Sequence, residues 1–134
     1  MRSMQIWLRL CALYNLAGGA ALVAPGVLDL FGVALPGSPF WLWLPALLGS
    51  FGAIALSIAS TDLNIYAPLA YWNAVIRLVY ASATFALGFA DTMGPFAAYL
   101  GAGDAVLGLV VLLGLPLVTG RSPASFLMNG MARA

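Results

Sequence analysis

The stretch Pro95–Val118, PFAAYLGAGDAVLGLVVLLGLPLV, decides the fold class of this chain. It contains a single charged residue, Asp104, within an otherwise apolar run. A helix needs about 20 mostly apolar residues to cross a hydrocarbon core of roughly 30 Å. A spanning segment must also satisfy its backbone hydrogen bonds internally, which a helix does. The stretch therefore predicts a membrane-crossing helix.

Three more stretches of this kind precede it, separated by proline, glycine and polar residues. Pro25-Gly26 closes the first stretch. Pro68 is expected to open the third, in the first turn of a helix, where its missing N–H is tolerated. Gly94-Pro95 separates the third stretch from the fourth. The sequence predicts one domain over residues 1–134, with helices at 4–24, 40–60, 68–90 and 95–118 and a tail at 119–134.

The composition agrees with a membrane protein. Of the 134 residues, 63% are hydrophobic and 7% are charged, and the mean hydropathy is +1.03. Soluble domains carry far more charge than this. The net charge of +1 argues against nucleic-acid binding, which needs a clustered basic surface. We therefore expect membrane lipid, and no nucleic acid, among the partners.

The connections between the predicted helices fix their arrangement. The first connection, 25–39, is the longest, and it is too apolar for a fully solvated loop. We expect it to lie in the membrane interface, with room for one short amphipathic helix. The other two connections are short, which favours antiparallel neighbours. The predicted fold is all-α: an antiparallel bundle of four transmembrane helices with an apolar, interfacial first loop.

Arginine placement predicts the orientation. Cytoplasmic ends of membrane helices are enriched in arginine and lysine. Four arginines flank the ends of the predicted bundle on one side, and the loops on the opposite side contain aspartates but no arginine. We expect a multi-pass protein of the bacterial cytoplasmic (inner) membrane with both termini cytoplasmic. Because Arg9 interrupts the first apolar run, we also expect that run to be retained and not cleaved as a signal peptide. The flanking arginines are Arg2, Arg9, Arg121 and Arg133.

Residue types that enzymes commonly use in catalysis are scarce in this sequence. The sequence has no histidine, which removes the commonest general base and metal ligand. Cys11 is the single cysteine, so no intrachain disulfide or CxxC motif can form. No phosphate-binding glycine loop or Ser/His/Asp set is present. We expect no enzyme activity, no catalytic residues, no metal site and no cofactor.

Two charged residues fall at membrane depth, where a charge needs a partner. Arg77 lies about ten residues into the third predicted helix, and Asp104 about ten residues into the fourth. Counting back from the Gly94-Pro95 turn at about 1.5 Å per residue puts them within roughly 6 Å of the same depth. Asn73, Tyr80 and Thr84 flank Arg77 at helical spacing and form a supporting polar face.

This pair allows two interpretations. It is either a clamp that fixes the register of two helices, or the centre of a ligand or proton site. In the clamp interpretation, removing one partner leaves an uncompensated buried charge and is severe. In the ligand interpretation, Arg77 and Asp104 hold an anion, a proton or the head of an amphiphile such as a quinone or lipid. Both interpretations stay open.

Small residues predict helix packing. Glycine and alanine let helix backbones approach closely inside membranes. Asp62 is expected to be a cap or turn residue, and Arg9 is expected to reach the interface or pair with Asp62. The residues assigned to helix packing are Asn15, Gly18, Gly19, Gly49, Ala53, Gly101 and Gly108.

Several short motifs follow one another in a recognisable order. They are YNLAGG (Tyr14–Gly19) followed by Pro25, Pro39-Phe40-Trp41, Thr61-Asp62, Arg77 and Asp104. In this order the chain resembles small four-helix bacterial membrane proteins of the DoxX-like kind, over residues 14–115. Members of that group commonly have lysine in place of Arg77 and Asn-Asp in place of Gly103-Asp104. The resemblance implies a compact bundle in which Arg77 and Asp104 pair, and it implies no activity.

Two functions are consistent with these features. The first is a non-catalytic accessory or structural subunit of a larger bacterial membrane complex, with other membrane subunits or a second copy as partners. Its basis is the small extramembrane mass and the small-residue faces. The alternative is a small transporter or binding protein for a proton, a small ion or a hydrophobic ligand such as a quinone or lipid. Its basis is the polar group around Arg77 and Asp104.

Overall fold

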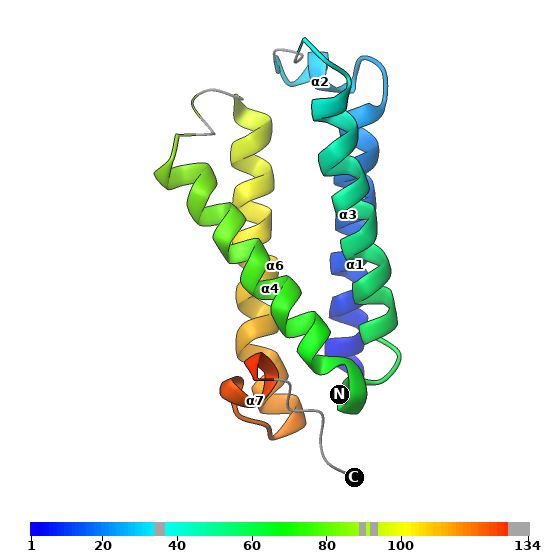
Figure 1. Ribbon diagram of the computed structural model, residues 1–134, viewed down its shortest axis with the longest axis vertical. Coiled ribbons are helices and arrows are strands. Elements are labelled where there is room, and N and C mark those ends of the chain that lie inside the picture. The colour runs from blue at the N-terminus through cyan, green and yellow to red at the C-terminus, as the bar shows by residue number, and fades with distance from the viewer. Residues whose placement is uncertain (34–36, 89–90, 92–93, 129–134) are drawn as a thin grey trace.

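The computed structural model describes residues 1–33, 37–88, 91 and 94–128, and these contain helices and turns but no strand. The all-helical prediction is therefore confirmed for this part of the chain (Figure 1). Residues 34–36, 89–90, 92–93 and 129–134 lie outside the description. The helices are α1 (Arg2–Val23), α2 (Val27–Leu30), α3 (Phe40–Ala59), α4 (Leu63–Ala86), α6 (Pro95–Thr119) and α7 (Pro123–Leu127).

Three of these helices, α1, α3 and α6, are long and apolar enough to cross a membrane. This agrees with a membrane protein. The fourth long helix, α4, has the length but not the apolar character, because it carries Asn64, Asn73 and Arg77. Three of the four predicted crossings thus have the expected length and composition, and the crossing by α4 stays a prediction.

The helix α4 begins at Leu63, and the prediction that Pro68 opens it is wrong. Asp62 caps the helix, accepting a hydrogen bond from the backbone N–H of Asn64 at 2.8 Å, as expected for a cap residue. Pro68 then lies inside the helix and has no N–H for the carbonyl of Asn64. Arg121 Nη1 donates to that carbonyl at 3.3 Å instead. A side chain beyond α6 thus replaces the missing backbone donor.

The bounds of α6 lie within one residue of the predicted 95–118. Gly94, with a φ of 76°, leads into Pro95 at the start of the helix. Gly120, with a φ of 67°, ends it, and its N–H donates to the carbonyl of Pro116 at 2.9 Å. Both glycines have a positive φ that residues with a side chain rarely adopt. The local sequence therefore determines both ends of this helix.

The long helices form two pairs, with α1 against α3 and α4 against α6 (Figure 1). Within each pair a glycine lets the backbones come close. A Cβ at Gly19 would lie 3.2 Å from the carbonyl oxygen of Ala46, and a Cβ at Gly108 would lie 3.1 Å from that of Ala74. Packing between the pairs is less extensive. The two pairs therefore leave room for a site between them.

Short helices form in the predicted first loop and tail. In the first connection, α2 buries Leu28 against Val33 and Phe96. In the stretch predicted as tail, α7 packs against α4, where the fully buried ring of Phe126 stacks on Tyr71 at 5.0 Å between centroids. The expected short helix of the first loop is present, and the tail is helical over 123–127.

Candidate functional site

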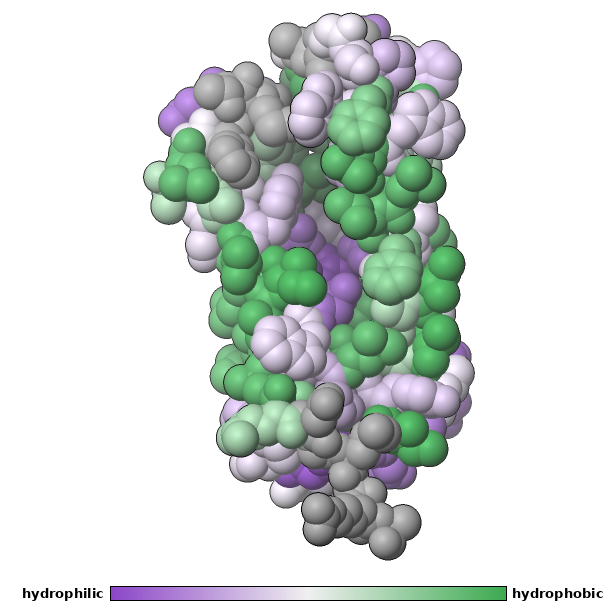
Figure 2. Space-filling view, in the orientation of Figure 1, coloured by the Kyte–Doolittle hydropathy of each residue, from purple (hydrophilic) through white to green (hydrophobic). Residues whose placement is uncertain are grey.

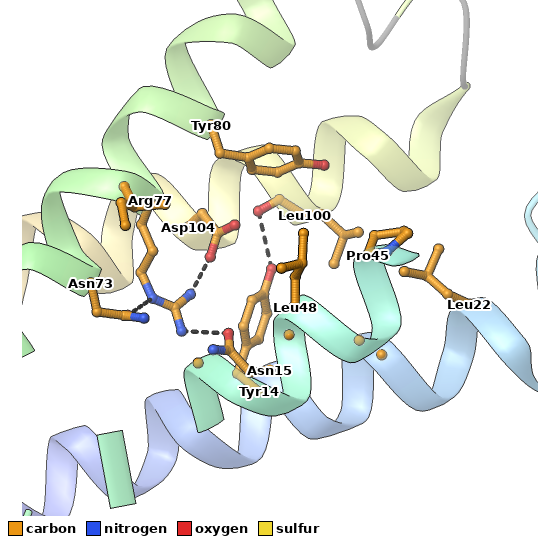
Figure 3. Close-up of a pocket in the computed structure, with 15 residues that line it drawn as sticks. Tyr14, Asn15, Leu22, Pro45, Leu48, Asn73, Arg77, Tyr80, Leu100 and Asp104 are labelled. Atoms are coloured by element: carbon orange, nitrogen blue, oxygen red, sulfur yellow. Dashed lines mark hydrogen bonds and ion pairs between the residues drawn. The ribbon is translucent and has the colours of Figure 1, made fainter. Parts of the chain in front are cut away.

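The guanidinium of Arg77 is the centre of a polar cluster between the helices (Figure 3). Its Nη1 donates to Asp104 Oδ1, and its Nε donates to Asn73 Oδ1 at 3.1 Å. Its Nη2 donates to Asn15 Oδ1 at 2.6 Å and to the backbone carbonyl of Cys11 at 3.2 Å. Only 5% of Arg77 is exposed. A buried guanidinium needs this many acceptors, because all its nitrogens are donors.

The cluster joins three helices, since α1 supplies Asn15 and Cys11, α4 supplies Arg77, and α6 supplies Asp104. The sequence predicted a partner on α6 alone. The guanidinium carbon also lies 5.6 Å from the centroid of the Tyr14 ring, within the range of a cation–π contact. The charge of Arg77 is balanced by the carboxylate of Asp104, so the cluster as a whole is close to neutral.

A cavity of about 330 Å³ lies beside this cluster, between the two helix pairs. Its polar side consists of Arg77, Asp104, Asn15 and Asn73 together with the two tyrosines Tyr14 and Tyr80. Figure 2 shows a hollow with a hydrophilic floor between hydrophobic side chains. The cavity is thus polar at its base and apolar at its walls. The apolar lining residues are Leu22, Pro45, Leu48, Ile76 and Leu100.

Two tyrosines border the polar base of the cavity (Figure 3). The hydroxyl of Tyr14 donates to the backbone carbonyl of Leu100 at 3.0 Å, which links α1 to α6. A side chain at Gly103 would overlap the Tyr14 ring, so the glycine is needed for this approach. Tyr80 comes from α4 and lines the cavity on the other side of Asp104.

The three residues of the predicted polar face have different surroundings in the structure. Asn73 and Tyr80 line the cavity, but Thr84 does not. Thr84 is fully buried, its Oγ1 donates to the carbonyl of Tyr80 at 2.9 Å, and its methyl group faces Gly101. Thr84 therefore belongs to the contact between α4 and α6.

The residues assigned to packing also divide. Ala53 is buried in the core, while Gly101 and Gly108 lie between α6 and α4. Gly18, Gly19 and Gly49 line the cavity, and Gly19 and Gly49 also lie in the contact between α1 and α3, where a Cβ at Gly49 would lie 3.3 Å from the carbonyl oxygen of Asn15. Asn15 was assigned to packing and is instead a direct partner of Arg77.

Tyr14 and Gly52 of the site were not predicted, and neither were its apolar lining residues. A signal existed for each, because Tyr14 directly precedes Asn15, and Gly52 follows Gly49 by nearly one helical turn. Of the two alternatives for Arg9, the pair with Asp62 is not formed among the described residues. Arg9 Nε donates to Ser60 Oγ at 3.4 Å, and Asp62 caps α4. That Arg9 reaches the membrane interface stays a prediction.

The chemistry of the cavity is that of hydrogen bonding. Over the described part of the chain, no group of three histidine, cysteine, aspartate or glutamate residues is placed to hold a metal ion. The balanced pair of Arg77 and Asp104 offers little net charge to attract an ion. What remains is a polar base with apolar walls, the usual form of a site for an amphiphilic small molecule.

No protein-family model, curated protein or solved structure matches this chain. The cavity and its lining residues are therefore the observations from which a function can be inferred.

Proposed function

We propose that this protein binds a neutral amphiphile from the membrane in the cavity between its two helix pairs. The observation that carries the proposal is the cavity of about 330 Å³, with the Arg77 cluster at its base and apolar side chains along its walls. This volume lies at the lower end of the range for small-molecule sites, about 300–1,000 Å³. A polar head would lie against the cluster, and an acyl or isoprenoid tail would leave along the apolar wall.

The charge balance favours a neutral head group. Arg77 makes hydrogen bonds to Asp104, Asn73, Asn15 and the carbonyl of Cys11. An anionic ligand would have to replace these bonds and would meet the carboxylate of Asp104. A cation would meet the guanidinium. Because each charge already has its partner, the ligand with the lowest desolvation cost is uncharged.

The accessory-subunit hypothesis is our second proposal, and it has less support. Its basis was the small-residue faces, which could pack against another protein. Gly19, Gly101 and Gly108 instead face other helices of the same chain. These faces are therefore used internally and give no argument for a partner.

We further propose that α4 crosses the membrane with α1, α3 and α6, as an antiparallel transmembrane bundle. Its polar residues Asn73 and Arg77 face the cluster and the cavity, so they need not contact lipid. The start of α1 and the helix α7 lie at the same end of the molecule (Figure 1). Both termini are proposed to be cytoplasmic, in a bacterial inner membrane, and the likeness to DoxX-like proteins stays a proposal.

The test is purification in mild detergent followed by mass spectrometry of retained small molecules. The variant Ile76→Trp places a large ring at the cavity wall, and Val79→Trp is its matched control. Both residues lie on α4 and are 63% exposed, but only Ile76 lines the cavity. We expect a retained amphiphile in the wild type and in Val79→Trp, and its loss from Ile76→Trp. Equal retention by both variants, or none by the wild type, would contradict the proposal.

A further inference from the structure

The amide groups of Asn15 and Asn73 have an orientation that chemistry dictates. A guanidinium only donates hydrogen bonds, so both amides must turn their oxygen atoms toward Arg77. The bonds from Arg77 Nη2 to Asn15 Oδ1 and from Arg77 Nε to Asn73 Oδ1 have this sense. The NH₂ group of each asparagine therefore points away from the guanidinium.

Both NH₂ groups converge on one place, next to Gly52 of α3. A Cβ built at Gly52 would lie 2.8 Å from Asn15 Nδ2 and 3.3 Å from Asn73 Nδ2. Gly52, Asn15 and Asn73 all line the cavity. The two NH₂ groups thus lie close to each other at this wall of the cavity although they come from different helices, and a side chain at position 52 would push against both.

These donors have no acceptor in the described part of the chain. No hydrogen bond from Asn15 Nδ2 or Asn73 Nδ2 occurs there, and neither nitrogen is fully enclosed by protein. Polar groups at membrane depth are costly unless they are paired. Two unpaired donors at the wall of a cavity therefore point to an acceptor that the ligand supplies.

We propose that the ligand carries a carbonyl oxygen, which accepts hydrogen bonds from Asn15 Nδ2 and Asn73 Nδ2 beside Gly52. This inference rests on the proposed function and adds the chemical class of the ligand. A carbonyl oxygen has two lone pairs and can accept from both amides at once. It is neutral, so it does not disturb the balanced charges of Arg77 and Asp104. Quinones and ester lipids share this group and occur in membranes.

The experiment compares two probes of equal chain length, 2-dodecanone and dodecane, for binding to the full chain in detergent. Two neutral hydrogen bonds correspond to about a tenfold preference for the ketone. The variants Asn15→Asp and Asn73→Asp each keep an acceptor for Arg77 but replace the NH₂ donors with an acceptor oxygen. We expect both to lose the preference for the ketone while still binding dodecane.

Two glycine variants form a matched pair. Gly52→Ala puts a methyl group 2.8 Å from Asn15 Nδ2 and 3.3 Å from Asn73 Nδ2, so that the two NH₂ groups must move from their places. Gly114→Ala adds a methyl group outside the cavity, where it meets only the flexible end of Met4. We expect Gly52→Ala to abolish the preference and Gly114→Ala to keep it.

The outcomes separate this inference from the proposed function. If dodecane and dodecanone bind equally well to the wild type, the carbonyl inference is wrong while the binding cavity stands. If neither probe binds, the proposed function itself fails. Identification of the retained native molecule completes the test. A retained quinone or ester lipid supports the inference, and its identity shows which of these two classes supplies the carbonyl group. A retained hydrocarbon or amine contradicts the inference.

Discussion

Arg77 on α4 and Asp104 on α6 form a buried ion pair, and α1 supplies Arg77 with two further acceptors. Single changes at this pair leave one charge without its partner, while the double change removes both charges. The cost of breaking a buried pair is about 3–5 kcal/mol. We expect Arg77→Gln and Asp104→Asn each to lower the thermal stability of the detergent-solubilised protein strongly.

The double variant tests whether the two residues act as a pair. We expect Arg77→Gln with Asp104→Asn to cost less than the sum of the single changes, with a coupling of about 1 kcal/mol or more. The coupling free energy is obtained by comparing the thermal unfolding of the wild type, the two single variants and the double variant in the same detergent. Additive costs would show that the two side chains do not depend on each other.

The contact between α4 and α6 needs a glycine at position 101. A Cβ there would lie 2.9 Å from Thr84 Cγ2 and 3.1 Å from Thr84 Cβ, and a β-branched side chain has little freedom to move. We expect Gly101→Ala to cost about 1–3 kcal/mol, as overpacking does. The measurement is the thermal midpoint in detergent.

Gly114→Ala is the matched control on the same helix. Its added methyl group would meet Met4 Cε, the end of a flexible side chain. Alanine is also the better helix former, by up to about 1 kcal/mol. We expect this variant to be near wild type. A larger loss for Gly114→Ala than for Gly101→Ala would refute the close approach at Thr84.

Phe126 holds α7 to the rest of the protein. Its ring is fully buried, stacks on Tyr71 and has the Arg121 guanidinium carbon 4.8 Å from its centroid. Replacing a buried phenylalanine with alanine costs about 3–5 kcal/mol, which exceeds what a five-residue helix can retain by itself. We expect Phe126→Ala to release α7 and to speed tryptic cleavage after Arg121, whereas Leu127→Ala, at a 41% exposed position, should not. Equal cleavage of the two variants would argue against this role.

The proposed crossing by α4 can be tested with single cysteines in a Cys11→Ala background. If α4 crosses, Thr61 and Asp91 lie on opposite sides of the membrane. We expect a membrane-impermeant thiol reagent applied to intact cells to label Asp91→Cys and Ser38→Cys but not Thr61→Cys or Ser3→Cys. Labelling of Thr61→Cys and Asp91→Cys from the same side would exclude the crossing.

Local sequence was sufficient to predict most helices and insufficient for the start of α4. The bounds of α6 follow from Gly94-Pro95 and Gly120, which act on their immediate neighbours. Pro68 reads as a helix start for the same reason. It lies inside the helix because Asp62 caps an earlier turn and because Arg121, far along the chain, donates to the carbonyl of Asn64. Rules about neighbouring residues cannot predict the contact between Arg121 and the carbonyl of Asn64, because the two residues are far apart in the sequence.

The site could be predicted only in part, because its partners are distant in sequence. Arg77 and Asp104 stand out, since lipid excludes charges. Asn15 lies 62 residues from Arg77 and reads as an ordinary packing residue in a small-residue row. Its role depends on how α1 sits against α4, which hydropathy does not specify. The role of Gly52 could not be predicted either, because it depends on the two side-chain amides that lie next to it in the folded chain.

The position of the acceptors along the chain has a consequence for biosynthesis. Ribosomes release the N-terminal helix first, so Asn15 and the carbonyl of Cys11 enter the membrane before Arg77 is made. The arginine can therefore find two of its acceptors on arrival. Asp104 is synthesised last, and its arrival on α6 supplies the counter-charge. A chain truncated before α6 would hold a hydrogen-bonded but uncompensated guanidinium at membrane depth, where an unpaired charge is costly.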